Sequence, residues 1–207
     1  MASRSKLYMP ADGFMSAHDS CADFINTPHI SFLSEIFILP LRYNNKCNTL
    51  PMSEVELYLI QEGENCTIYT LQFLRDVESE FEKFIAKFRE DAEYSEDFSR
   101  IAAFIKRIAR TGALERYFRP EGKINDSVVA LPVTNSKLRL YCLRLSDKIL
   151  VLGNGGVKTS QRYEDDILLN GYVMTLQKFE KLLRQEVANG NVNITESTIE
   201  TDNIFEL

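Results

Sequence analysis

The sequence predicts an α+β domain in which an antiparallel β-sheet meander carries a helix pair and a C-terminal helix on one face. Three observations indicate this fold class. Two β-branched and aromatic runs stand close together after residue 52, two apolar patterns at helical spacing follow them, and three strand-like segments with short links come next.

The first pair of strands is predicted over residues 55–60 and 66–73, which are rich in β-branched and aromatic side chains. The polar segment 61–65 separates them, and two such runs joined by a short link predict a β-hairpin. The stretch 52–60 is predicted to be the start of a domain with an edge strand.

Two amphipathic helices are expected after the hairpin, over about 76–90 and 96–111. The second ends at Gly112, since glycine is favoured just after the last helical turn. The inward-facing residues recur at helical spacing and are Val77, Phe81, Phe84, Ile85 and Phe88 in the first helix, and Ile101, Phe104, Ile105 and Ile108 in the second.

Three strands are then predicted over residues 127–133, 138–145 and 149–153, and links this short imply antiparallel neighbours. A last helix is expected over about 171–188, where it would bury Val173, Leu176, Phe179 and Leu183. The remaining residues, 189–207, read as a flexible acidic tail.

The domain boundaries follow from these elements. Residues 52–188 form the predicted domain, and residues 1–51 are expected to be a weakly structured N-terminal extension without a sustained helical or strand period. Two interpretations stay open for the extension: Met52 is the natural start and the preceding stretch comes from an over-extended reading frame, or the stretch is a genuine, weakly ordered arm.

Composition restricts the class of protein. The chain has 207 residues, of which 44% are hydrophobic and 26% charged, close to average globular usage. No stretch approaches 18 consecutive apolar residues, so no transmembrane helix and no membrane partner are expected. The four cysteines show no paired short spacing, which indicates neither a zinc site nor a disulfide framework. We therefore expect a cytoplasmic protein without metal or cofactor.

The net charge of −6 arises from 24 basic and 30 acidic side chains and conceals an uneven distribution. Counted along the sequence, residues 1–51 carry a net charge of 0, residues 52–100 carry −8, residues 101–163 carry +8 and residues 164–207 carry −6. A basic centre between acidic segments points to an anionic partner. The alternative is that the oppositely charged segments neutralise each other in the fold.

The predicted domain has no histidine, because both histidines of the chain lie within residues 1–51. A histidine-centred triad, metal cluster or general base is therefore excluded in it. Arginine, lysine and tyrosine remain, and these residues suit phosphate binding and stacking on bases.

Side chains alternate along the strand 138–145, so Leu138, Leu140 and Cys142 share one face. If that face packs on the helices, Arg139 and Tyr141 lie together on an open face, where they could bind a phosphate and support a base. An exposed, solubilising pair is the alternative. Arg144 has the wrong parity to join them unless a bulge intervenes.

A glycine-rich segment, 153–160, follows the last strand of the meander. Its Gly/Lys spacing does not match a P-loop. The glycines would permit a bend or bulge and would bring Lys158, Arg162 and Tyr163 to the sheet end near Arg139. A solvated glycine turn is the alternative.

A third basic group precedes the meander and contains Arg116, Arg119 and Lys123 with interleaved Tyr and Phe side chains. Such residues suit a single-stranded RNA surface, and they are equally compatible with an ordinary basic loop.

Residues 66–188 resemble RelE/HigB-type toxins of toxin–antitoxin modules. The similarity lies in the helix pair and the segments Ala130–Pro132, Leu138–Tyr141 and Ile149–Leu152, followed by a glycine turn and Lys158. The resemblance implies a RelE-like fold, mRNA cleavage, commonly in the ribosomal A site, and a cognate antitoxin partner. It also implies that Arg139 binds phosphate, that Lys158 and Arg162 supply further cations, and that Tyr163 orients the 2′-hydroxyl or stacks on a base.

The sequence departs from this family on the first meander strand, where residues 127–131 lack the lysines that members cutting on the ribosome often carry. Lys123 could substitute, although it stands earlier in the chain. Two alternatives therefore stay open: a noncatalytic interaction protein on the same scaffold, and a ParE-like protein that acts on gyrase.

Overall fold

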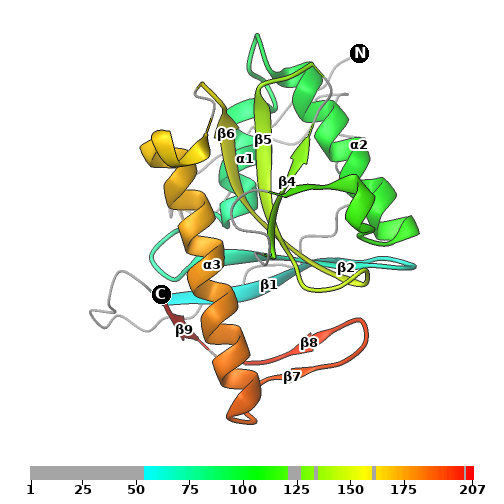
Figure 1. Cartoon of the computed structure of the whole chain (residues 1–207), viewed down its shortest axis with the longest axis vertical. Helices are drawn as coiled ribbons and strands as arrows, with labels where there is room; N and C mark the ends of the chain where they lie inside the picture. Colours follow the sequence, from blue (N-terminus) through cyan, green and yellow to red (C-terminus); the bar gives the residue numbers. More distant parts are fainter. Residues whose placement is uncertain (1–53, 121–126, 133–134, 160–161, 203) are drawn as a thin grey trace, which may run out of the picture. The chain divides into compact units, whose positions relative to one another are not determined.

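The computed structural model of the chain describes residues 54–120, 127–132, 135–159, 162–202 and 204–207, and it has an α+β fold (Figure 1). Lys123 and the expected N-terminal extension lie outside the described residues. The elements are β1 (Glu54–Glu62), β2 (Thr67–Phe73), α1 (Glu80–Phe88), α2 (Ser95–Thr111), the 3-10 helix η2 (Glu115–Tyr117), β3 (Arg119–Pro120), β4 (Val128–Pro132), β5 (Leu138–Arg144), β6 (Ile149–Val157), the 3-10 helix η3 (Tyr163–Asp165), α3 (Ile167–Ala188), β7 (Asn193–Ile194), β8 (Ile199–Glu200) and β9 (Phe205–Glu206).

The main sheet has seven strands in the order β3-β4-β5-β6-β2-β1-β9. The predicted β1–β2 hairpin and the antiparallel β4-β5-β6 meander are both confirmed. The sheet is mixed rather than antiparallel, because β2 pairs with β6 in parallel. The chain between these two strands passes through α1, α2 and the meander, and it returns beside β2 in the same direction.

The expectation that all helices lie on one sheet face is wrong. One core contains Leu140 and Cys142 of β5 with side chains of α1 and α2, and a second core contains Tyr141 and Leu143 with side chains of α3. Figure 1 shows α3 in front of the sheet and α1 behind β5 and β6. Because both faces of β5 are apolar, each face needs a helical layer to exclude water.

The helix ends follow from local hydrogen bonds. Ser79 and Glu82 form a capping box, so α1 begins at Glu80 rather than near 76, and Val77 lies outside it with 80% of its surface exposed. The predicted end of α2 at Gly112 is confirmed by a φ of 91° at this residue. Asp166 accepts hydrogen bonds from two amides and caps α3, which therefore begins one turn earlier than expected.

The expected flexible tail is instead folded. Strands β7 and β8 pair with each other, and β9 pairs with β1 at the edge of the main sheet. Val192, Ile199 and Phe205 are buried, and the Ile199 amide donates to the Tyr69 hydroxyl at 2.9 Å. These apolar side chains complete the core beneath α3, which explains why a polar-looking tail packs on the domain.

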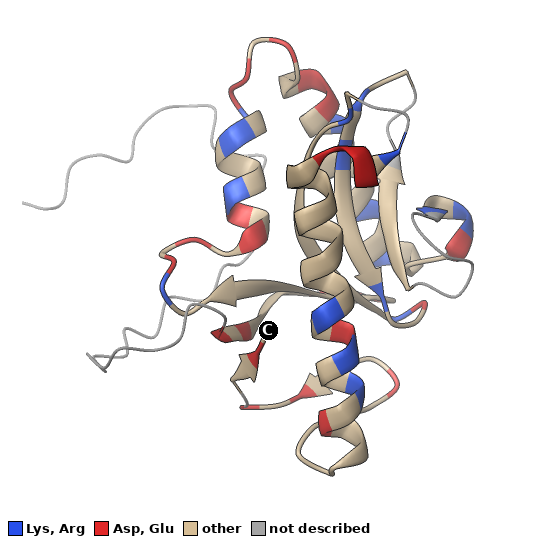
Figure 2. Ribbon diagram, turned by 60° about the vertical axis from the view of Figure 1, so that its left-hand side comes forward, with Lys and Arg blue, Asp and Glu red and all other residues tan. Residues whose placement is uncertain are grey.

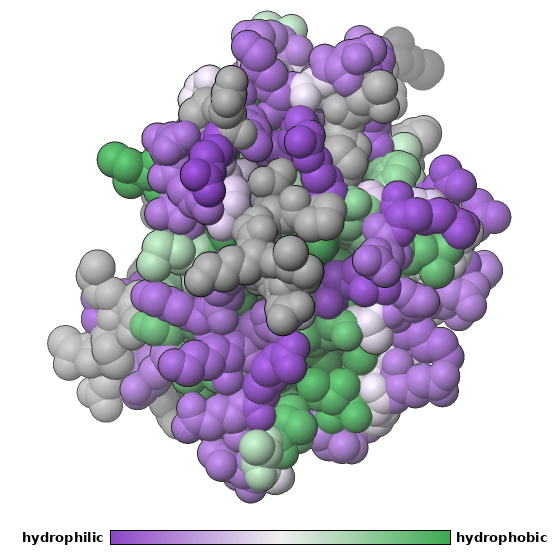
Figure 3. Space-filling model, in the orientation of Figure 1, coloured by the Kyte–Doolittle hydropathy of each residue, from purple (hydrophilic) through white to green (hydrophobic). Residues whose placement is uncertain are grey.

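Figure 3 shows a mainly hydrophilic surface, with a hydrophobic patch beside the C-terminal half of α3, near β7 and β8. In the part of the chain that the structure describes, no helix combines the length and the apolar character that crossing a membrane requires.

Candidate functional site

Strand register brings together the cations expected at the end of the β5–β6 ladder. Arg139 is opposite Gly156, and the Lys158 amide donates to the Lys137 carbonyl at 2.8 Å. Lys137, which the sequence analysis missed, is exposed and lies beside Lys158 across the ladder. Its position immediately before a predicted strand was the available signal. We call Lys137, Arg139, Lys158 and Arg162 the basic edge.

The glycines of β6 allow a close approach between the strands and the helices. A Cβ on Gly155 would lie 2.0 Å from the Arg139 carbonyl oxygen, and one on Gly156 would lie 2.9 Å from a Leu169 methyl group. The β5–β6 register shifts between Leu140 and Cys142, which confirms the expected bulge. Since residues 153–156 are buried within β6, the alternative of a solvated glycine turn is wrong.

The Arg139 side chain is half-buried and held in one orientation. Its Nη1 donates to the carbonyl oxygens of Ser136 and Leu138, both at 2.8 Å. Its Nε is buried, and no acceptor for it lies among the described residues. Two fixed hydrogen bonds reduce the conformational freedom that a phosphate ligand would otherwise have to remove.

Arg162 is 74% exposed, and its Nε lies 2.9 Å from the Glu164 carboxylate, which is 43% exposed. An ion pair this exposed contributes little to stability, so a phosphate could replace the carboxylate at small cost. Glu164, Asp165 and Asp166 form an acidic segment at the start of α3, next to the basic edge. The ribbon in Figure 2 shows an acidic stretch at the start of α3 close to Lys and Arg positions at the same end of the sheet.

The expected open face with a stacking tyrosine is absent from the described structure. Tyr141 is 0% exposed and Tyr163 is 8% exposed, because α3 and η3 cover this side of the sheet. Their ring centroids lie 6.3 Å apart in an edge-to-face contact. Neither ring is presented to a base, so the expected stacking roles of Tyr141 and Tyr163 do not fit this conformation.

The other predicted cations separate onto two sides of the edge strand. Arg116 and Arg107 both lie over the ring of Tyr117, at 5.2 and 5.1 Å from its centroid, in the core that contains α2. Arg119 is exposed and pairs with Ala130, which faces α3. Arg119 therefore shares the sheet face of Arg139, whereas Arg116 packs beside α2.

A buried polar network lies behind the β6 bulge and was not predicted. Asn154 Nδ2 donates to Glu80 Oε2 at 3.0 Å, and Lys83 contacts the other oxygen of Glu80 at 2.6 Å and also Asp76. Burial, and next the nearby Glu80 carboxylate, raise the pKa of Tyr172. The network holds the bulge against α1, and a lone Asn between glycines gives no sequence signal for it.

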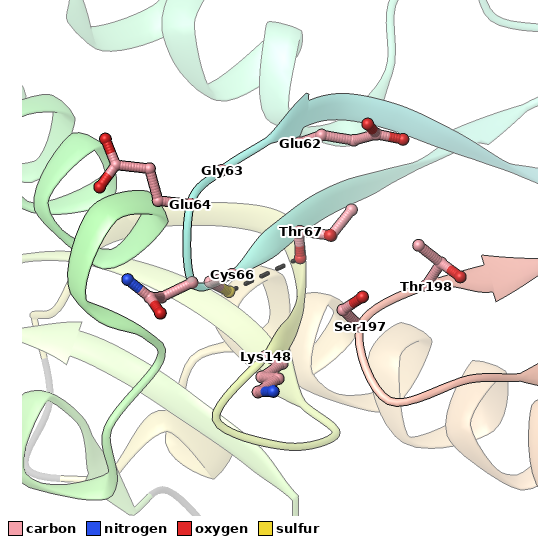
Figure 4. Close-up of a pocket in the computed structure, with 9 residues that line it drawn as sticks. Glu62, Gly63, Glu64, Cys66, Thr67, Lys148, Ser197 and Thr198 are labelled. Carbon is pink, nitrogen blue, oxygen red and sulfur yellow. Dashed lines mark hydrogen bonds between the residues drawn. The ribbon is translucent and has the colours of Figure 1, made fainter.

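A cavity of about 260 Å³ lies between the β1–β2 turn, the β5–β6 turn and the β7–β8 turn (Figure 4). Lys148 lines it and pairs with Glu196. Cys66 also lines it, but burial raises the pKa of its thiol to about 11, so the thiol is not an activated nucleophile. No group of three or more His, Cys, Asp or Glu side chains within the described residues could hold a metal ion.

Comparison with protein-family models, with curated proteins and with solved structures gives no match. The site is therefore interpreted from its own residues.

Proposed function

We propose that the chain is the toxin component of a toxin–antitoxin module of RelE/HigB type, an endoribonuclease with a RelE-like domain that cleaves mRNA in association with the ribosome and is inhibited by a cognate antitoxin. The observation that carries this proposal is the basic edge. Side chains from the start of β5, the end of β6 and the loop before α3 supply four cations to one end of the sheet.

The proposed chemistry requires little beyond positioning and charge. The ribose 2′-oxygen attacks the adjacent phosphorus, the bond to the 5′-oxygen breaks, and a 2′,3′-cyclic phosphate forms as the proton passes to the leaving oxygen. Arg139 and Lys158 would stabilise the negative charge that develops on the phosphate, and Arg162 would leave Glu164 to contact the RNA backbone. Tyr163, being buried, would support the site by packing on Tyr141 rather than by stacking on a base.

A second candidate is a noncatalytic interaction protein, including a ParE-like gyrase poison. The burial of Tyr141 and Tyr163 favours it, because the described site then contains cations but no exposed aromatic ring. The same fold and basic edge would serve to bind an acidic partner without cleaving it.

Induction in a bacterial host with mapping of transcript 5′ ends separates the two candidates. We expect growth arrest with cleaved messages, relieved by Arg139→Ala and by Lys158→Ala. Arg184→Ala is the matched control, since this exposed arginine pairs with Glu180 near the far end of α3. Growth arrest with intact messages would reject the nuclease and leave the interaction protein.

Binding of the purified protein to labelled single-stranded RNA tests the basic edge directly. Each phosphate contact removed should reduce the slope of log affinity against log salt by about 0.7. We expect this reduction for Lys158→Ala and no change for Arg184→Ala. Equal slopes for both variants would show that RNA binds elsewhere. Thermal unfolding of each variant distinguishes lost binding from lost folding.

A further inference from the structure

Strand β1 has one edge that is largely unpaired among the described residues. It pairs with β2 from Val55 to Glu62, but with β9 only at Glu54 and Val55. About six residues of β1, roughly 20 Å of strand, therefore continue beyond β9 without a described neighbour on that side. An exposed strand edge is a template for pairing with another chain.

The direction of the main-chain groups shows which residues could bind there. The Leu74 amide donates to the Glu54 carbonyl at 3.0 Å, so the polar groups of Glu54 point toward β2. Because these directions alternate along an antiparallel strand, the amide and carbonyl of Val55, Leu57 and Leu59 point away from β2. Val55 faces Phe205 of β9, and Leu57 and Leu59 present their groups to the unpaired edge.

Acidic side chains lie on both faces of this edge. The bulge between Leu59 and Gln61 places Glu62 on the sheet face of Leu59, opposite to the face of Glu56. Glu56 accepts a hydrogen bond from Tyr58 at 2.9 Å, and β9 places Glu206 directly opposite Glu54. Glu62 is exposed near the end of the strand, and β1 contains no basic residue. Burial and the Glu56 carboxylate raise the pKa of Tyr58 to about 12, in keeping with negative surroundings. Leu57 and Leu59 are half-buried against the α3 core.

A carboxylate oxygen at the start of the edge adds to its negative charge. Oε2 of Glu54 is buried and has no hydrogen-bond partner among the described residues. A buried carboxylate oxygen without a donor is costly, and the like charge of Glu206 across the strand pair adds to the cost. A cation near Glu54 would reduce both the cost of burying this oxygen and the repulsion from Glu206.

We propose that the edge of β1 at residues 57–62, which has no partner strand among the described residues, binds an extended cationic segment of a partner protein by strand addition. Lys or Arg at alternate positions would lie over Glu56 on one face, and apolar residues between them would lie over Leu57 and Leu59 on the other face. Glu62 adds negative charge near the end of the strand. A second copy of the chain is a poorer occupant, because two acidic edges would face each other. This edge is distinct from the basic edge, and the proposal stands whether or not the protein cleaves RNA.

A fluorescein-labelled peptide of alternating Lys and Val, with anisotropy as the readout, tests the proposal on the full-length protein. Two matched peptides carry N-methyl groups either on the Val residues or on the Lys residues, so that each blocks the hydrogen bonds of one peptide edge. Strand addition predicts that one of them loses binding and the other keeps it. Equal behaviour of the two, or no binding of the parent peptide at about 1 mM, would overturn the proposal.

The acidic side chains and the edge amides provide the other two readouts. We expect the double variant Glu56→Gln, Glu62→Gln to bind about fivefold more weakly at low salt, and Glu164→Gln, a remote exposed carboxylate, to be unchanged. Hydrogen exchange at the Leu57 and Leu59 amides should slow only when peptide is added. Slow exchange in the dilute free protein would show that the chain itself or a second copy already occupies this edge, and would reject the partner strand.

Discussion

Two glycines illustrate how one atom decides stability at the residue scale. In β6, a Cβ on Gly155 would lie 2.0 Å from the Arg139 carbonyl oxygen and 2.9 Å from the Phe84 ring. In α3, a Cβ on Gly171 would meet nothing within 4 Å. The first glycine is therefore required by close packing, whereas the second only weakens a helix.

We predict opposite effects for alanine at these positions. Gly155→Ala should lower the free energy of unfolding by about 1–3 kcal/mol, because backbone and ring must move apart. Gly171→Ala should raise it by up to about 1 kcal/mol through helix propensity. Urea unfolding measures both, and equal midpoints for the two variants would contradict the described packing of β6.

The buried thiols give a second prediction at this scale. Burial raises the pKa of Cys66 to about 11 and also raises the pKa of Cys142. A raised pKa in the folded state favours the protonated thiol, and this contribution to stability is present below the ordinary thiol pKa of about 8.5 and lost as the pH rises through about 11.

Iodoacetamide at pH 8 should therefore leave Cys66 and Cys142 unmodified in the native protein and alkylate both in urea. Mass spectrometry of the separate peptides identifies each cysteine. Native labelling of Cys66 at the rate seen in urea would show that its thiol is accessible and ionised.

At the scale of the element, the start of α3 links helix stability to the charge of the site. The Asp166 carboxylate accepts hydrogen bonds from the amides of Leu168 and Leu169, at 3.0 and 3.1 Å. It also adds negative charge beside the basic edge. Asp166, which caps the helix, therefore opposes the binding of an anion at the basic edge.

Two substitutions should separate these effects. Asp166→Ala removes the cap and should cost about 1 kcal/mol of stability, whereas Asp166→Asn keeps an acceptor and should cost less. If RNA binds at the basic edge, both variants should bind labelled single-stranded RNA more tightly at low salt. Unchanged RNA affinity in both would place the RNA away from α3.

At the scale of the whole molecule, the last strand closes the core beneath α3. Phe205 is 2% exposed, and its ring contacts that of Phe179 at 5.0 Å between centroids. Its neighbour Ile204 is 49% exposed. Phe205 therefore belongs to the core, whereas Ile204, immediately before it, faces solvent.

Phe205→Ala should lower the free energy of unfolding by about 3–5 kcal/mol, as expected for loss of a buried aromatic side chain. Ile204→Ala should change it by no more than about 0.5 kcal/mol. Chemical denaturation of both variants tests this difference, and a small effect of Phe205→Ala would mean that the tail does not stabilise the domain.

The distribution of charge also belongs to the whole molecule. The basic segment 101–163 supplies all four cations of the basic edge, Lys137, Arg139, Lys158 and Arg162. The acidic segment that follows it begins at Glu164, directly beside them. Part of the positive charge is therefore neutralised locally, as in the Arg162–Glu164 pair.

Local patterns in the sequence determined the strands, the helices and much of the candidate site. Alternation identified Leu140 and Arg139 as neighbours on opposite faces of β5, and helical spacing identified the buried residues of α3. The closeness of Arg139 and Lys158 was predictable because short links force β5 and β6 to be adjacent. These features depend on residues close together in the chain.

Only the tertiary structure decided which surfaces are covered. The strand pattern of β5 does not say that α3 packs over Tyr141, and nothing near Asn154 indicates that Glu80, 74 residues away, binds it. The packing of Phe205 on Phe179 and the unpaired edge of β1 likewise depend on segments distant in sequence. Burial results from the whole chain excluding water at once, so the sequence specified the residues of the site and the fold decided which of them reach its surface.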